Sequence, residues 1–504
     1  MLDASRPRSP LPLHGIAASR AIEQQAQAAL PAHTLMRRAG AAVARLALAV
    51  APHAQRVWIA AGPGNNGGDG LEAAIGLLAA GRAVRVALVG DAAALPPDAA
   101  DALRRAQDAG VEIGATGAPR LERHDLAIDA LLGLGASRAP RDALAATIGA
   151  FDALACTVLA VDVPSGLHCE TGQPLGEVCV RAAHTLALLT LKPGLFTGLG
   201  RDLAGYVWFD DLGVAGGAQA PGAWLTGTDA ARALRAPRRH AQHKGSFGDL
   251  AVVGGAAGMT GAAVLAARAA HAAGAGRVYV DLLDGAAPDL DFARPELMFR
   301  RAWWQGERAV IGAATVVCGC GGGDAVREAL PRLSSLADRL VLDADALNAI
   351  ASDEALQTQL AARAARGQAT VLTPHPLEAA RLSGASAREV QADRLRAAQT
   401  LAERFRCVVL LKGSGSIVAA PGRVPQINPT GNASLATAGT GDVLAGWLGG
   451  LWAQSGHGES PFEIAAAAAC AHGAAADGTA VAPLRAADLI EAMLRDANAA
   501  ARAA

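Results

Sequence analysis

The length, composition and charge of the chain exclude several classes of protein. The chain has 504 residues, enough for about two to four domains, and 52% of them are hydrophobic while only 3% are aromatic. The net charge of −1 provides no basic face for nucleic acid, and no apolar run reaches the roughly 18 residues that a membrane span needs. Because the N-terminus lacks the apolar segment of a signal peptide and the seven cysteines are scattered, we expect a cytoplasmic protein with reduced thiols.

The first half of the chain alternates apolar segments with helical patterns. This alternation is typical of a parallel sheet covered by helices on both faces. A stretch rich in glycine, alanine and proline at 213–224 interrupts the pattern, and a polar stretch follows it, so we predict a domain boundary near residues 215–240. The predicted strands of the first half are residues 57–60, 84–89, 126–132, 157–163 and 185–191.

The second half restarts the alternation and ends in helices. Helical patterns cover residues 441–454, 461–477 and 485–502. We therefore predict a second α/β domain, and we expect it to be unrelated to the first because no close repeat links the two halves. Its predicted strands are residues 250–255, 277–283, 315–320, 339–345, 369–375 and 407–413.

The first predicted strand leads into AGPGNNGGDG at residues 61–70. A glycine-rich turn between a strand and a helix usually cradles phosphate, and Gly62, Gly64 and Gly67 fit the G-x-G-x-x-G pattern. The carboxylate of Asp69 would repel a phosphate, whereas carboxylate and asparagine oxygens are hard ligands for a cation. The segment is therefore predicted to face a phosphate with its amides and a metal ion with its side chains.

Two further strand ends carry polar residues that should converge on this segment. Asp129 lies in IDALLGLG, and VDVPSG places Asp162 and Ser165 after the fourth strand. Ligands of open α/β sheets bind outside the carboxyl ends of the strands, so Asn66, Asp129 and Ser165 could hold one monovalent cation. Asp162, next to that cation, would keep a role in proton transfer.

A plain Rossmann NAD-binding domain is the alternative interpretation of the first half. Its ribose-binding acid would be Asp91, about 20 residues past the glycines. This interpretation assigns no purpose to Asn65, Asn66 or Asp69. For VDVPSG alone, a capped turn without function remains an equal alternative.

The strongest local signal of the second half is NPTGNASLATAGTGDVLAGWLGGL at residues 428–451. A helix is expected to begin near Asp442, and the amides at its start form an anion hole. Asp442 could take a proton from a hydroxyl that approaches the hole, as phosphoryl transfer to an alcohol requires. Lys412, before a Gly/Ser turn, suits a nucleotide phosphate, and His375 lies between another strand and a helix.

Lysine is rare in this chain. Of 45 basic residues only Lys192, Lys244 and Lys412 are lysines, and each stands in a glycine motif. Lysine offers a compact point charge where a planar guanidinium would not fit. We interpret the three lysines as functional, with coincidence as the alternative.

These motifs resemble a known family. GPGNNGGDG, DALLGLG and VDVPSG resemble the NAD(P)H-hydrate epimerase domain, while HKGSFG, LDADALN, LTPHPLE, LKGSGS and NPTGNASLATAGTGD resemble the ADP/ATP-dependent NAD(P)H-hydrate dehydratase of the ribokinase-like superfamily. Their order resembles the fused bifunctional repair enzymes of bacteria. The resemblance implies an epimerase domain at residues 1–220 with a Rossmann-like three-layer αβα fold, and a dehydratase domain at residues 225–504 with a ribokinase-like three-layer αβα fold.

The resemblance also implies an activity. Nicotinamide dinucleotides hydrated at C6 of the ring would be interconverted between R and S epimers by the first domain, and the S form would be dehydrated by the second at the expense of ADP or ATP. Phosphorylation replaces hydroxide, a poor leaving group, by phosphate, a good one. Implied with this activity are K⁺ in the first domain, Mg²⁺ with the nucleotide in the second, small molecules as partners, and a homo-oligomer.

The resemblance finally assigns site residues. Asp162 and Asp442 would be catalytic, and Asn66, Asp129 and Ser165 would hold K⁺. In the first domain the hydrate would contact Asn65, Asn66, Gly67, Gly68, Asp69, Gly133, Leu134, Gly135, Ala136, Ser137, Arg138, Ala139 and Asp162. In the second domain the hydrate would contact Ala262, Gly321, His375 and Asp442, and the nucleotide would contact Lys412, Gly413, Ser414, Gly415, Ser416 and Gly441.

Two positions depart from the family pattern. Cys320 stands in CGCGGG where proline is usual, and Arg37 stands where glutamate is common. A small-alcohol or vitamin kinase fused to a nucleotide-binding module is the alternative function, and a non-catalytic dinucleotide sensor is a third. The kinase and the repair enzyme give Asp442 the same role, whereas the sensor gives it none.

Overall fold

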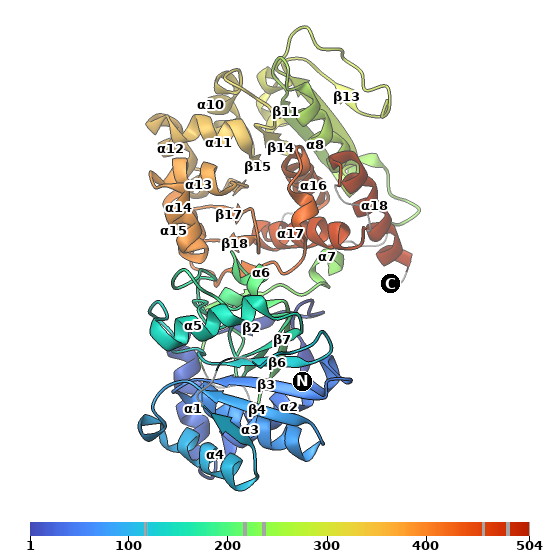
Figure 1. Cartoon of the computed structure of the whole chain (residues 1–504). Helices are drawn as coiled ribbons and strands as arrows, with labels where there is room; N and C mark the ends of the chain where they lie inside the picture. The colour runs from blue at the N-terminus through green and yellow to red at the C-terminus, as the bar shows by residue number, and fades with distance from the viewer. Residues whose placement is uncertain are drawn as a thin grey trace. The chain divides into compact units, whose positions relative to one another are not determined.

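The chain forms two compact units in the computed structural model (Figure 1). The first unit comprises Met1–Pro7 and Leu11–Leu225, and the second comprises Arg8–Pro10 and Thr226–Ala504. The structure describes residues 1–114, 117, 119–214, 219–233, 238–455, 459–479 and 484–502. Parts of the predicted boundary, residues 215–218 and 234–237, lie outside the described residues.

A largely parallel sheet forms the centre of the first unit, in the order β1-β9-β8-β7-β6-β3-β4-β5. All five predicted strands are confirmed within a few residues. The short strands β1, β5 and β9 at the two edges were not predicted. The strands are β1 (Leu2–Asp3), β3 (Arg56–Ala61), β4 (Ala83–Leu88), β5 (Glu112–Gly114), β6 (Leu126–Ala130), β7 (Thr157–Val161), β8 (His184–Leu188) and β9 (Tyr206–Asp210), while β2 (Leu11–Leu13) pairs separately with β10 (Ala223–Leu225).

Helices cover both faces of this sheet. Successive strand residues point to opposite faces, so Val57 and Ile59 pack with α2, α3 and α4, whereas Trp58 and Ala60 pack with Ile148 of α5 and with Phe151. The predicted three-layer arrangement is therefore present. The helices are α1 (Ile16–Ala29), α2 (Thr34–Val50), α3 (Asn65–Ala79), α4 (Pro97–Asp108), α5 (Asp142–Ala150) and α6 (Gly200–Ala204).

Helix α3 begins earlier than the sequence pattern indicated. The glycine motif was predicted as a turn, but Asn65 is already the first helical residue, with Gly64 as its N-cap. Its glycines serve close packing: a Cβ on Gly70 would lie 2.6 Å from the Cβ of Ala130, and one on Gly68 would lie 2.5 Å from Cε of Met36. Glycines that look like a turn thus bring the helix onto the sheet.

A second sheet organises the second unit, with strands in the order β13-β12-β11-β14-β15-β16-β17-β18-β19. Strands β11, β12 and β14 to β17 are parallel and correspond to the six predicted strands, whereas the short parallel strand β13 and the antiparallel strands β18 and β19 were not predicted. The strands are β11 (Asp249–Gly254), β12 (Arg277–Leu282), β13 (Met298–Phe299), β14 (Thr315–Cys318), β15 (Arg339–Leu342), β16 (Ala369–Leu372), β17 (Val408–Leu411), β18 (Ile417–Ala419) and β19 (Gln426–Ile427).

Alanine-rich helices α8, α16, α17 and α18 share one core with a face of this sheet. Figure 1 shows them on one side and α10 to α13 on the other. A Cβ on Gly450 of α16 would meet Ala270 of α8, which explains how close-packed helices replace aromatic residues in the core. The helices are α7 (Ala230–Ala233), α8 (Thr260–Ala273), α9 (Arg308–Ala313), α10 (Val326–Leu336), α11 (Ala344–Ala351), α12 (Glu354–Ala361), α13 (Pro376–Ser383), α14 (Ala387–Ala392), α15 (Arg394–Phe405), α16 (Thr440–Gln454), α17 (Pro461–Asp477) and α18 (Ala486–Arg502).

The segment Arg8–Pro10 belongs to the second unit although its flanking residues belong to the first. The carbonyl of Arg8 accepts a hydrogen bond of 3.0 Å from the Asp229 amide. Among the helices of the described residues, none is long and apolar enough to cross a membrane.

Candidate active sites

A cavity of about 450 Å³ lies at the carboxyl ends of the strands of the first unit. It contains most of the polar residues that the sequence singled out there. It also contains charged residues of α1 and α4 and a lysine that the sequence did not place there. The predicted residues in its lining are Asn65, Asn66, Asp69, Gly133, Leu134, Gly135, Ala136 and Asp162, and the further charged ones are Arg20, Glu23, Asp98 and Lys192.

Asp162 is fixed in this cavity by a buried lysine. Its backbone is left-handed, with φ of 68°, an uncommon conformation for a residue with a side chain. Lys192 Nζ donates to Asp162 Oδ1 and, at 2.8 Å, to the Leu188 carbonyl. The Leu134 amide donates to Asp162 Oδ2 at 3.0 Å. The carboxylate is therefore held in one orientation at the cavity wall, with its charge neutralised by the ammonium.

Two predicted metal ligands, Asp129 and Ser165, form one buried hydrogen-bonded pair. Ser165 Oγ donates to Asp129 Oδ1 at 2.6 Å, and the Ser165 amide donates to Asp129 Oδ2 at 2.7 Å. Burial raises the pKa of Asp129 to about 6, against the opposing effect of these hydrogen bonds. The pair forms because β6 and β7 are parallel neighbours whose carboxyl ends meet.

Asn66, the third predicted ligand, lies on the cavity side. A Cβ on Gly133 would lie 3.1 Å from Asn66 Oδ1 and 3.2 Å from Asp162 Oδ2, so the two side chains flank the same glycine. The Asn66 side-chain nitrogen is buried without a hydrogen-bond partner. A buried amide without a partner is costly, and this one is available to a bound molecule.

Asp69 and Glu23 add two more carboxyl groups to the cavity. Burial, and secondly the charge of Asp162, raises the pKa of both, and that of Asp69 lies well above its usual range. The cavity thus combines an ion-paired carboxylate with two carboxyl groups whose pKa values are raised. Glu23 carries no sequence signal because α1 contains no motif, whereas Lys192 was marked by its glycine context.

Five predicted contact residues are not in the cavity lining. Gly67 and Gly68 pack against Gly62 and Met36, so they support the wall from behind. Ser137, Arg138 and Ala139 follow the lining residues Gly133–Ala136 and lie beyond them.

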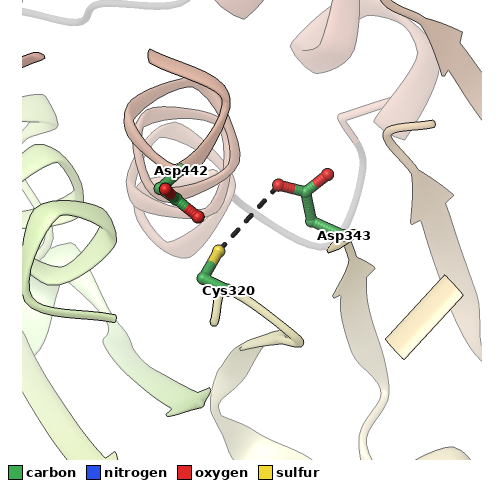
Figure 2. Close-up of side chains that lie close together, drawn as sticks. All are labelled: Cys320, Asp343 and Asp442. Carbon is green, nitrogen blue, oxygen red and sulfur yellow. Dashed lines mark hydrogen bonds between the residues drawn. The ribbon is translucent and has the colours of Figure 1, made fainter. Parts of the chain in front are cut away.

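The second unit gathers Cys320, Asp343 and Asp442 at the carboxyl ends of its strands (Figure 2). Cys320 follows β14, Asp343 follows β15, and Asp442 lies in the first turn of α16, which begins at Thr440 after Gly439 with φ of 90°. Burial, then the charge of Asp343, raises the pKa of Asp442 to about 6. A carboxylate with this pKa at a helix start can accept a proton near neutral pH.

Lys412 pairs with Asp343, not with Asp442. Its Nζ lies 2.6 Å from Asp343 Oδ1 and 4.0 Å from Glu378 Oε2. A Cβ on Gly441 would lie 3.4 Å from the same Nζ, so the lysine reaches the N-terminus of α16. The ammonium therefore stands between the acidic cluster and the amides of the helix start.

The loop 412–416 joins β17 to β18 above a buried arginine. Arg394, 1% exposed, donates to the carbonyls of Lys412 and Gly415 at 3.2 and 3.4 Å. Gly413 has φ of 129°, and a Cβ there would lie 3.0 Å from Arg394. With its carbonyls held by Arg394, the loop is fixed in shape.

His375 is the N-cap of α13. Its Nδ1 accepts from the Leu377 amide at 3.1 Å, while Glu378 Oε2 accepts from the His375 amide at 2.8 Å. Burial lowers the pKa of His375 and raises that of Glu378 to about 7. Because Nδ1 is an acceptor, Nε2 carries the proton in the neutral ring, and it faces Glu378 Oε1 at 3.3 Å.

Ala262 and Gly321 adjoin each other as one predicted contact surface. A Cβ on Gly321, which has φ of 58°, would lie 2.8 Å from the Cβ of Ala262. Asp343, Glu378 and Arg394 were not predicted as site residues, although LDADALN and LTPHPLE had marked the segments of the first two. Arg394 carried no signal, since nothing local distinguishes it from solvated arginines.

Two units of α/β fold, each with a lysine and carboxylates at the carboxyl ends of a parallel sheet, define the chain as an α/β enzyme with two separate sites. Residues 250–495 match the family model described as NAD(P)H-hydrate dehydratase, and residues 32–194 match the model described as YjeF-related protein N-terminus.

Known proteins are similar in sequence to this chain over most of its length. The bifunctional NAD(P)H-hydrate repair enzyme Nnr of Escherichia coli K12 is 37% identical over 460 residues, which cover 89% of this chain and 85% of that protein. The enzyme of the same name from Coxiella burnetii is 35% identical over 432 residues, which cover 84% and 86%. A solved ADP/ATP-dependent NAD(P)H-hydrate dehydratase from Bacillus subtilis, co-crystallised with ATP/Mg²⁺, is 27% identical with a TM-score of 0.44, over 54% of this chain and 97% of that one.

The chain belongs to the family of bifunctional NAD(P)H-hydrate repair enzymes. The predicted family is confirmed, and the bifunctional enzyme is favoured over the vitamin kinase and the non-catalytic sensor.

Proposed function

We propose that the chain carries both reactions of its family on separate units. Residues 1–220 would interconvert the R and S forms of hydrated NADH or NADPH, and residues 225–504 would dehydrate the S form at the expense of ADP or ATP. The observation that carries this assignment is that each unit places an aspartate, Asp162 or Asp442, beside a lysine-containing cluster at its strand ends.

In the first unit, Asp162 would act as the proton-transfer group at C6. The ion pair with Lys192 and the Leu134 amide hold its carboxylate toward the cavity. Asp69, whose pKa is raised by burial, would supply the matching protonated group. The C6 hydroxyl would take up one proton and leave as water. A water molecule would then add to the opposite face of C6 and release a proton, which gives the other epimer.

We further propose K⁺ at Asn66, Asp129 and Ser165. Buried carboxylate, hydroxyl and amide oxygens are the donors that a hard cation takes, and the raised pKa of Asp129 indicates a carboxyl group that lacks a compensating positive charge. A monovalent ion would supply this charge and fix the loop of Gly133 that Asp162 contacts.

In the second unit, Asp442 would take the proton of the C6 hydroxyl as its oxygen attacks the terminal phosphorus of the nucleotide. The amides at the start of α16 and the ammonium of Lys412 would stabilise the phosphate charge, and the loop 412–416 would hold the nucleotide. Mg²⁺ would bind with the nucleotide and screen its phosphates. His375, Ala262 and Gly321 would contact the hydrate beside Asp442.

Hydrated NADH tests both halves in one assay of the intact chain. Incubation of the S form with protein and ADP or ATP should restore the near-ultraviolet absorbance of NADH, and the R form should follow when K⁺ is present. A stable phosphorylated product without recovery of that absorbance would contradict the dehydratase. Recovery from the S form alone, at every K⁺ concentration, would contradict the epimerase.

We also propose a cytoplasmic homo-oligomer. The scattered free thiols support the compartment, and the oligomer rests on the family resemblance alone. Light scattering after size-exclusion chromatography measures the oligomeric state, and cell fractionation measures the compartment.

A further inference from the structure

We propose that Cys320, Asp343 and Asp442 form a binding site for a thiophilic divalent cation of the Zn²⁺ class, and that the bound ion switches off the second unit. The binding rests on the geometry alone, whereas the effect on catalysis rests on the dehydratase activity proposed above.

Three different elements bring the side chains together. Strands β14 and β15 are parallel, with Cys318 opposite Leu342, so the residues that follow them, Cys320 and Asp343, come out at the same edge. The first turn of α16 adds Asp442. Figure 2 shows the thiol and the two carboxylates directed toward one another, with Cys320 Sγ 4.0 Å from Asp343 Oδ2.

The spacing of the ligand atoms fits a small cation. One atom from each of the three side chains lies within 4.8 Å of the other two. Tetrahedral Zn²⁺ with metal–sulfur and metal–oxygen bonds of about 2.3 and 2.1 Å needs ligand atoms roughly 3.6 Å apart. Side-chain rotations that move the ligand atoms by about 1 Å close the difference. Three protein ligands leave a fourth position open.

The two carboxylate oxygens of Asp343 have different partners. Oδ1 accepts from Lys412 at 2.6 Å and from Thr373 Oγ1 at 2.9 Å, and Oδ2 faces the thiol of Cys320. A cation at Oδ2 can therefore bind without breaking the ion pair of Lys412.

The charge around the three side chains favours a cation. The carboxylates of Asp343 and Asp442 lie close together beside the thiol, and the ammonium of Lys412 is bound at the other oxygen of Asp343, so the two carboxylates repel one another. A dication would relieve this repulsion.

The thiol sets the class of the ion. Mg²⁺ prefers oxygen ligands in an octahedron, whereas a thiolate ligand selects Zn²⁺ and its softer relatives. On binding, the S–H bond of Cys320 breaks, a sulfur–metal bond forms, and the proton passes to solvent. No oxidant or reductant takes part.

Coordination would remove the base of the dehydratase. A dication bound to Asp442 would withdraw charge from the carboxylate and make it a much weaker acceptor for the proton of a hydroxyl. The first unit does not use these residues, so the two activities of one polypeptide would respond differently to the same ion.

The test uses the full-length protein and Cd²⁺ or Co²⁺ without nucleotide. We expect about one equivalent of bound metal with a thiolate-to-metal charge-transfer band in the ultraviolet. Cys320→Ala should lose the band and most of the binding, Cys320→Ser should lose the band, and Cys318→Ala, a buried thiol two positions away, should keep both. Thermal unfolding of each variant verifies that the second unit is folded.

Several outcomes would overturn the site. They are no band in the parent protein, a band that persists in Cys320→Ala, or bound metal without any thiolate signal. In a parallel titration, Zn²⁺ should lower the dehydratase rate at least about tenfold, a chelator should restore it, and the epimerase rate should stay within twofold. A metal band with no dehydratase activity under any condition would instead leave the site standing and contradict the proposed function.

Discussion

The two units use lysine in different ways beside their central aspartates. In the first unit Lys192 binds Asp162 itself, which lines the cavity and is the proposed proton-transfer group. In the second unit Lys412 binds Asp343, and Asp442 is left beside two carboxylates with a pKa raised to about 6.

The difference follows the chemistry proposed for each unit. An epimerase has no phosphate to bind, so its ammonium can be committed to the carboxylate. A phosphoryl-transfer site needs a cation that faces the phosphate, so the lysine is anchored by a neighbouring aspartate and still reaches the helix start. The same pair of residue types thus fixes a carboxylate in one unit and positions a cation in the other.

The largest expected effect comes from the two aspartates themselves. Asp442→Asn should lower the dehydratase rate by about 10² to 10⁴, and Asp162→Asn should do the same to the epimerase, since each removes a proton acceptor. Each variant is the control for the other, and the untouched activity should stay within about twofold. Equal losses of both activities in either variant would contradict the separation of the sites.

A buried histidine should make the second unit sensitive to acid. His472 Nε2 donates to the Thr440 carbonyl at 2.9 Å, beneath the start of α16, and burial lowers its pKa to about 4. Below pH 6.5 the unfolded chain takes up a proton that the folded one does not, so stability is full above that pH and falls as pH drops toward 4. The loss is up to about 3 kcal/mol.

Hydrogen exchange of peptides from α16 and α17, measured between pH 7 and 4, would report this loss. His472→Gln keeps a donor for Thr440 and has no titrating ring, so its exchange should depend less on pH. An unchanged dependence in this variant would assign the acid sensitivity to other groups.

Substitution of Lys192 and substitution of Lys412 should change different kinetic parameters. Lys192→Met leaves Asp162 without its ion pair and should lower the epimerase kcat about tenfold to a hundredfold, whereas Lys412→Met should chiefly raise the KM for nucleotide. Steady-state kinetics at saturating and limiting substrate separate the two. Lys192→Arg, which keeps the charge but not the shape, should rescue little, because a planar guanidinium does not reproduce the contacts of the buried ammonium with Asp162 and with the Leu188 carbonyl.

The smallest effects distinguish two kinds of glycine. Gly70→Ala would press a Cβ against Ala130 and should lower the stability of the first unit by about 1 to 2 kcal/mol, as overpacking does. Gly441→Ala meets only Lys412 Nζ at 3.4 Å, so it should leave the melting temperature unchanged and weaken nucleotide binding. Calorimetry measures the stability of both variants, and nucleotide titration measures the affinity of Gly441→Ala. A lower melting temperature for Gly441→Ala would show that this glycine is needed for packing.

The sequence predicted the parallel strands and the residues at their ends, because alternating apolar segments and local motifs determine both. It did not predict that α3 starts at Asn65, since glycines are usually poor helix formers and only their close contact with the sheet favours helix here. Partners that come from distant segments were also missed. Glu23 reaches the cavity from α1, and Asp343 reaches Lys412 through neighbouring strands, and no local pattern contains such contacts.

The interrupted course of the chain at Arg8–Pro10 has a practical consequence. A gene truncated near codon 226 would encode a C-terminal fragment without this short piece, and the Asp229 amide would lose the carbonyl of Arg8. If such a fragment is inactive or unstable, the cause would be the absence of Arg8–Pro10 and not the absence of a catalytic residue. Chimeras between related enzymes should accordingly exchange Arg8–Pro10 together with the rest of the second unit.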